Sequence, residues 1–188
     1  MVKKLTIFHA LEPFLSKPKE KLHLAEISRK IKEPHPTVRQ LLNQLERKGV
    51  LKKQFQGRLT LYSLNLEHQN IIDYLAIAEK ARLIRKCEKW LVLKELVHFI
   101  NSRCGENVKA LVFGSATESF DKAEDVDLLL IGKIDAKSIR KFAERVNKEL
   151  HIINVGTLNK ISKSLKEEIV KKHLLIKGSE EVIKWIVW

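Results

Sequence analysis

One stretch of the chain, residues 110–132, constrains the fold more than any other. It contains two short apolar runs, residues 110–113 and 128–131, and each is typical of a buried strand. The first run ends at Gly114-Ser115, and a polar segment separates it from the second. The stretch therefore predicts two neighbouring strands joined by a glycine-serine turn and a polar loop.

Two aspartates stand at the start of the second strand. Residues two apart in a strand point to the same face, so we expect Asp125 and Asp127 side by side, with Val126 and Leu128 in the core. Two like charges this close need a positive group between them, and a divalent ion with oxygen ligands is the usual solution. The alternative is a buried strand whose acidic edge simply faces solvent.

The order Gly114-Ser115, spacer, Asp125-apolar-Asp127-apolar resembles the signature of the DNA polymerase β-type nucleotidyltransferases, in particular their minimal, single-domain branch. The resemblance implies that Asp125 and Asp127 are catalytic metal ligands. It also implies that Gly114 and Ser115 hold the phosphates of a nucleoside triphosphate bound with Mg²⁺. A closing segment, residues 168–181, resembles the end of such domains, so the resemblance covers about residues 90–188.

The chain departs from this family in two places. The family carries a third carboxylate on the next strand, but the strand expected here, residues 151–155, has no acidic residue. Glu149 lies two residues before His151 and could share its face, but it is expected at the end of the preceding helix, residues 136–150, and is a weak substitute for the third carboxylate. Glu118 stands about where the family's turn often carries an arginine, and its charge would repel a phosphate. Whether the chain is an enzyme is therefore left open.

The first third of the chain has the element order of a different domain. This order of helices, turn and hairpin resembles the winged helix-turn-helix DNA-binding domains of bacterial and archaeal regulators. We expect Thr37 to cap the third helix and Gly49 to end it. The expected elements are helices over 5–15, 25–31 and 37–48, an extended piece over 22–24, and strands over 50–51 and 59–64 around a basic hairpin, residues 54–58.

Charge supports a polyanionic partner for this first domain. The net charge of the chain is +13, and the first 65 residues hold 14 Lys and Arg against 5 Asp and Glu. The winged-helix resemblance implies double-stranded DNA as the partner, although winged helices also serve as protein-binding modules. The residues expected to face bases are Thr37, Arg39, Gln40, Asn43 and Gln44. Those expected to contact phosphates are Arg47, Lys48, Lys52, Lys53 and Arg58.

Residues 57 to 105 contain Gly only at the two ends and no Pro, which predicts a helical connector. We expect an α+β chain with a winged helix-turn-helix over 1–65, this connector over 66–103 and a small nucleotidyltransferase-like α/β domain with a mixed sheet over 104–188. Apolar stripes on the connector could form the seam of a homodimer, or they could pack on the chain's own domains.

The remaining features favour a cytoplasmic protein. Cys87 and Cys104 have neither a metal motif nor the number needed for a disulfide scaffold, so we expect buried free thiols. We find no signal peptide and no apolar run of membrane-spanning length.

Three functions stay open from the sequence. The chain could transfer a nucleoside monophosphate to a hydroxyl of a protein, nucleic acid or small molecule. It could be a transcriptional regulator whose second domain is catalytically degenerate and binds a nucleotide or has only a structural role. It could also be an antitoxin-like protein that binds its own operator and a partner toxin.

Overall fold

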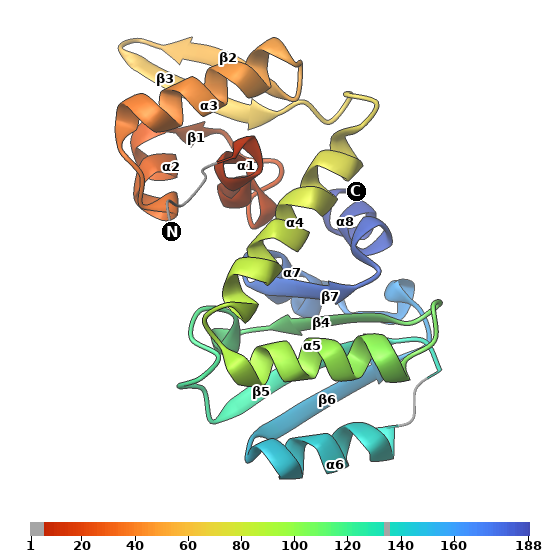
Figure 1. Ribbon diagram of the computed structural model, residues 1–188. Coiled ribbons are helices and arrows are strands. Elements are labelled where there is room, and N and C mark those ends of the chain that lie inside the picture. The colour runs from red at the N-terminus through yellow and green to blue at the C-terminus, as the bar shows by residue number, and fades with distance from the viewer. Residues whose placement is uncertain (1–5, 134–135) are drawn as a thin grey trace. The chain divides into compact units, whose positions relative to one another are not determined.

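The computed structural model describes residues 6–133 and 136–188. The chain divides into two compact units, one through Ala81 and one from Arg82 to Ile186 (Figure 1). Helix α4, Ile71–Cys87, contains this division, and α5, Leu91–Arg103, follows in the second unit. The segment expected to be a connector, residues 66–103, thus contains two helices.

The first unit is a winged helix-turn-helix, as the sequence predicts. Its three strands form an antiparallel sheet in the order β1-β3-β2. Leu5, where the first helix was expected to begin, lies outside the described residues. The elements before α4 are α1 Ile7–Leu15, β1 Leu22–His23, α2 Leu24–Ile31, α3 His35–Arg47, β2 Leu51–Gln56 and β3 Leu59–Leu64.

Helix α3 begins two residues earlier than expected. Pro34 occupies the N-cap position and Pro36 lies in the first turn, so the prediction that Thr37 caps this helix is wrong. Proline is tolerated there because the first N–H groups of a helix have no partner within it. The helix ends as predicted: Gly49 has φ +73°, a left-handed conformation that glycine adopts without strain.

The hairpin after α3 is longer than the sequence suggests. Strand β2 extends to Gln56 and pairs with β3 from Leu51↔Leu64 to Gln56↔Leu59, leaving only Gly57 and Arg58 in the turn. The expected strand over residues 50–51 was too short, because the residues that follow are mostly polar and exposed and show no apolar alternation. The wing is therefore a regular two-stranded ribbon that carries its basic residues on strands as well as at its tip.

The second unit has a four-stranded mixed sheet in the order β6-β5-β4-β7. Strand β4 is antiparallel to β5 and β7, whereas β5 and β6 are parallel. This confirms the predicted α+β class with a mixed sheet. The elements after α5 are β4 Lys109–Phe113, the 3₁₀ turn η1 Ser115–Thr117, β5 Asp125–Ile131, α6 Ala136–Val146, β6 Glu149–Val155, the 3₁₀ turn η2 Leu158–Lys160, α7 Lys163–Lys171, β7 His173–Lys177 and α8 Ser179–Val187.

The junction between α6 and β6 differs from the prediction. The helix was expected to run to Leu150, but Asn147 adopts a left-handed conformation, φ +52°, and ends it. The Asn147 N–H donates to Glu144 O and the Lys148 N–H donates to Ala143 O, which is the hydrogen-bond pattern of a Schellman cap. Strand β6 therefore starts at Glu149, so the prediction of a third strand without an acidic residue is wrong.

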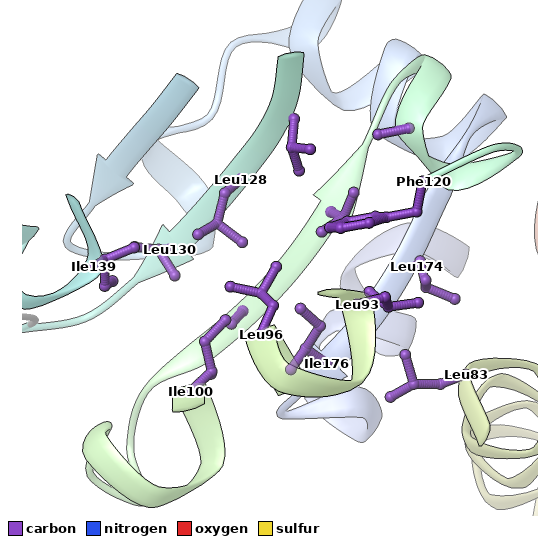
Figure 2. Packing of buried hydrophobic residues seen from close by; sticks show 14 of the residues in the cluster. Leu83, Leu93, Leu96, Ile100, Phe120, Leu128, Leu130, Ile139, Leu174 and Ile176 are labelled. Atoms are coloured by element: carbon purple, nitrogen blue, oxygen red, sulfur yellow. The ribbon is translucent and has the colours of Figure 1, made fainter. Parts of the chain in front are cut away.

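Apolar side chains from α5, α6 and one face of the sheet form the main core of the second unit. Figure 2 shows Leu96 and Ile100 of α5 packed towards Leu128 and Leu130 of β5, with Phe120 covering one end. The alternate residues of the strands, such as Leu111 and Leu129, are also fully buried, so both faces are covered at the sheet centre.

Both cysteines are free and half-buried beside this core, and burial raises the pKa of each thiol. The thiol form is therefore favoured, which makes both side chains poor nucleophiles. Among residues 6–133 and 136–188, no helix combines the length and apolar character needed to cross a bilayer.

We predict that Leu96→Ala lowers the free energy of unfolding of the second unit by about 2–5 kcal/mol, because it opens a cavity at a fully buried position. Leu91→Ala on the same helix is the matched control, since Leu91 is 67% exposed and should cost under about 0.5 kcal/mol. All three tryptophans, Trp90, Trp185 and Trp188, lie in the second unit. Urea unfolding followed by tryptophan fluorescence therefore measures this unit; equal effects of the two variants would contradict the described core.

Candidate functional site

The parallel pairing of β5 and β6 brings four polar side chains to one face of the sheet. Asp125 lies opposite Glu149, and Asp127 lies opposite His151. Because side chains alternate along a strand, all four point to the same side, away from Val126 and Leu128 in the core. The predicted pair Asp125 and Asp127 is thus joined by Glu149, which the sequence interpretation rated only a weak substitute, and by His151, which it did not include.

His151 links the other three groups of the site. One donor atom from each of Asp125, Glu149 and His151 falls within 4.8 Å of the others. The Nε2 of His151 is 3.4 Å from Oε1 of Glu149, and its Nδ1 is 3.5 Å from Oδ1 of Asp127. The imidazole therefore lies between two carboxylates. Asp125, Glu149 and His151 are exposed and Asp127 is half-buried, so an ion can reach the site from solvent.

The carboxylates favour the protonated form of His151. The hydrogen bond to Glu149 is the largest cause of its raised pKa, and the charges of Asp125, Glu149 and Asp127 act in the same direction. Desolvation opposes this shift. Three carboxylates around one imidazole give the face an excess of negative charge, which attracts cations.

The Gly114-Ser115 turn lies directly beside Asp127. Gly114 has φ +73°, and a Cβ at this position would approach Oδ2 of Asp127 to 2.7 Å, closer than real contacts allow. The Thr117 hydroxyl donates to Gly114 O at 2.8 Å and fixes the turn. Ser115, the first residue of η1, is exposed. The structure thus brings Gly114, one of the two predicted phosphate-binding residues, against Asp127, one of the two predicted metal ligands.

The acidic residue in this turn is offset by a lysine. Glu118 Oε1 lies 3.4 Å from the Nζ of Lys172, the residue just before β7. Lys172 also accepts a hydrogen bond at its carbonyl from the N–H of Gly114, at 3.1 Å. The charge of Glu118, which the sequence suggested would repel a phosphate, is therefore partly neutralised at the turn itself.

This donor set suits a divalent cation. Carboxylate oxygens are hard ligands for Mg²⁺ and Mn²⁺, while an imidazole nitrogen suits Zn²⁺ and other transition ions. Glu149 lies on the strand after the aspartate pair, which is where the nucleotidyltransferase resemblance implies a third carboxylate. The local signal that could have revealed it is Asn147, because asparagine tolerates the left-handed conformation that ends a helix.

The residues expected to contact DNA lie on α3 and on the wing. Most are exposed; Thr37, Asn43 and Lys53 are half-buried. The Nζ of Lys53 donates to Oδ1 of Asn43 at 3.3 Å, which links the helix to the wing. The Nζ of Lys52 donates to Glu67 at 2.9 Å, so part of its charge is already neutralised. The whole set is Thr37, Arg39, Gln40, Asn43, Gln44, Arg47, Lys48, Lys52, Lys53 and Arg58.

Comparison with known proteins identifies the first unit. Residues 8–54 match the family model of the IclR helix-turn-helix domain. The first unit is a helix-turn-helix domain of the DNA-binding regulator type. No curated protein matches the chain.

Three solved structures show limited similarity to the chain. A mutant of the toxin–antitoxin pair MntA-HpeT gives a TM-score of 0.38 at 13% identity, over 50% of this chain and 79% of that one. MepR, a transcription regulator of the Staphylococcus aureus multidrug efflux pump MepA, gives a TM-score of 0.35 at 19% identity, over 51% of this chain and 76% of that one. The archaeal chromatin protein TrmBL2 gives a TM-score of 0.28 at 19% identity, over 86% of this chain and 68% of that one. TM-scores this low do not establish a shared overall fold.

We predict that Gly114→Ala destabilises the second unit by about 1–3 kcal/mol, because alanine is strained at a positive φ. The new Cβ would also displace the carboxylate of Asp127. Gly105→Ala is the matched control, since Gly105 has open space around it and no positive φ, and should change stability by less than about 0.5 kcal/mol. Urea unfolding followed by tryptophan fluorescence compares them; a neutral Gly114→Ala variant would refute the described turn.

Proposed function

We propose that the chain is a DNA-binding transcriptional regulator whose second unit binds a divalent metal ion together with a nucleoside triphosphate. The observation that carries the second part is the shared face of Asp125, Asp127 and Glu149 beside the Gly114-Ser115 turn. The first part rests on the helix-turn-helix domain and on its excess of basic residues. A bound metal ion would neutralise the carboxylates and the phosphates of the nucleotide.

Transfer of a nucleoside monophosphate is the enzymatic form of this proposal. Glu149 favours it, because it restores a third carboxylate in register with Asp125. In this role Asp125 and Asp127 hold the metal, Ser115 donates its hydroxyl to a phosphate, and Glu149 orients the attacking hydroxyl. Incubation with each labelled triphosphate, Mg²⁺ or Mn²⁺ and cell lysate would reveal a labelled acceptor.

A degenerate, non-catalytic unit is the second candidate. His151 favours it, since this residue and not an acid lies opposite Asp127 on β6. A unit of this kind would still bind metal and nucleotide but would label no acceptor. The partner toxin and the homodimer expected from the sequence stay predictions, and no described contact bears on either.

We predict that the chain binds duplex DNA and that affinity falls steeply with salt. Arg39→Glu with Arg58→Glu should weaken binding at least about 100-fold, because each lost contact costs about 1–3 kcal/mol and the reversed charges repel phosphate. Lys80→Glu with Lys94→Glu is the control. It makes the same change in net charge at exposed positions outside α3 and the wing.

Fluorescence anisotropy with a labelled duplex measures both variants across a salt series. Equal losses in the two would show that net charge, and not the face of α3 and the wing, governs binding. An unchanged affinity for the Arg39/Arg58 variant would remove DNA contact from that face.

We predict that Mg²⁺ with a triphosphate raises the melting temperature of the second unit, because a ligand that binds only the folded state stabilises it by about 2.7 kcal/mol at 100 times its Kd. Asp125→Asn with Asp127→Asn should abolish this shift. Without metal, the same variant should be at least as stable as wild type, because it removes like-charge repulsion.

The control for this variant removes the same charge elsewhere on the second unit. Glu106→Gln with Asp121→Asn changes two exposed side chains away from the strands of the site and should keep the ligand response. Tryptophan fluorescence during heating reports the unit. If wild type shows no shift with any triphosphate and Mg²⁺, nucleotide binding is refuted and the DNA-binding regulator remains.

A further inference from the structure

The site differs from an all-carboxylate metal site in one respect, which is the position of His151. The ring presents a different nitrogen to each neighbouring carboxylate: Nε2 to Glu149 and Nδ1 to Asp127. A metal-bound histidine needs one nitrogen for the ion and usually donates the other N–H to a carboxylate, which fixes the orientation of the ring. His151 has a carboxylate beside each ring nitrogen, so one nitrogen can bind an ion next to Glu149 while the other faces the carboxylate of Asp127.

The spacing on the Nε2 side fits one ion. Two ligands about 2.1 Å from an ion at a tetrahedral angle lie about 3.4 Å apart. The Nε2 of His151 is 3.4 Å from Oε1 of Glu149. One donor atom each of Asp125, Glu149 and His151 lies within 4.8 Å of the other two, and all three side chains are exposed, so their rotamers are free to adjust to a shared ion.

Asp127 lies on the other side of the imidazole. Its Oδ1 is 3.5 Å from Nδ1, and its Oδ2 lies against the backbone of Gly114, where no Cβ intervenes. Asp127 is also less exposed than the other three groups. This position fits a residue that orients the histidine better than one that shares the ion with Asp125.

We propose that Asp125, Glu149 and Nε2 of His151 bind a divalent transition-metal ion of the Zn²⁺ type in preference to Mg²⁺, and that Asp127 orients the imidazole. The proposal rests on the metal-binding part of the proposed function; it specifies the ion and replaces Asp127 as a metal ligand by His151. Imidazole is a ligand for Zn²⁺, Fe and Ni, whereas Mg²⁺ requires oxygen ligands in near-ideal octahedral geometry. Two carboxylates and one imidazole leave a position open for water or for an oxygen of a bound ligand.

Titration of the metal-free full chain with ZnCl₂, CoCl₂ and MgCl₂ tests the proposal without any nucleotide. Calorimetry gives the affinities, and the visible absorption of bound Co²⁺ reports its ligands. We expect Zn²⁺ and Co²⁺ to bind at least tenfold more tightly than Mg²⁺. His151→Ala should abolish that preference, and His98→Ala, at an exposed position on α5, should leave it unchanged. His151→Asp should instead favour Mg²⁺, since all donors are then oxygens.

Asp127→Asn separates the two roles of the aspartates. If Asp127 orients His151, this variant should bind Co²⁺ about 10–100-fold more weakly but keep the wild-type spectrum. Asp125→Asn should lose or alter the spectrum. A changed spectrum in Asp127→Asn would place Asp127 among the ligands and overturn its assigned role.

Two outcomes distinguish this proposal from the proposed function. In the first outcome, Mg²⁺ binds with a triphosphate, but Zn²⁺ binds no more tightly than Mg²⁺ or its affinity is unaffected by His151→Ala. This outcome would overturn the ion assignment alone. Tight, His151-dependent Zn²⁺ binding without any nucleotide-induced thermal shift would support the ion assignment and refute the nucleotide-binding function.

Discussion

The register of β5 against its neighbours is the constraint on which the site depends. Val126 and Leu128 are fully buried, and each contributes about 1.5–3 kcal/mol by leaving water. A slip of one residue would expose both and turn Asp125 and Asp127 into the core. The apolar face of β5 therefore holds the carboxylates in place against their mutual repulsion, and the same strand determines which residues of β6 stand opposite them.

Much of this arrangement could be predicted from the sequence, because its signals are local. The alternation from Asp125 to Leu128 gives both the strand and the shared face of the two aspartates. The helical spacing of Val38, Leu42 and Leu45 gives the buried side of α3, and the left-handed Gly49 gives its end. In each case one short window determines the outcome, so no knowledge of distant parts of the chain is needed.

The other half of the site, Glu149 and His151, was harder to predict. The local sequence pattern does not decide whether Glu149 belongs to the helix or to the strand that follows. Leu150 continues the helical spacing of Phe142 and Val146, so the helix appeared to include Glu149. In the structure, the helix cap at Asn147 and the pairing with β5 override the helical spacing of the apolar residues. Strand β6 therefore begins at Glu149, two residues earlier than expected. The position of His151 between Glu149 and Asp127 depends in addition on strand register, which is a long-range property that single-sequence patterns do not encode.

The turn beside the site is hydrogen-bonded to the part of α4 that belongs to the second unit. The Nζ of Lys86 on α4 donates to the carbonyl of Thr117 at 2.6 Å, and Arg82 on the same helix donates to the carbonyl of His173. Ile71 and Leu75, near the other end of α4, are buried and belong to the first unit. A ligand changes DNA affinity only if it binds two states of the protein with different free energies. A ligand that displaced the turn at Thr117 would break or strain its hydrogen bond from Lys86, and it would therefore bind two states of the second unit with different free energies.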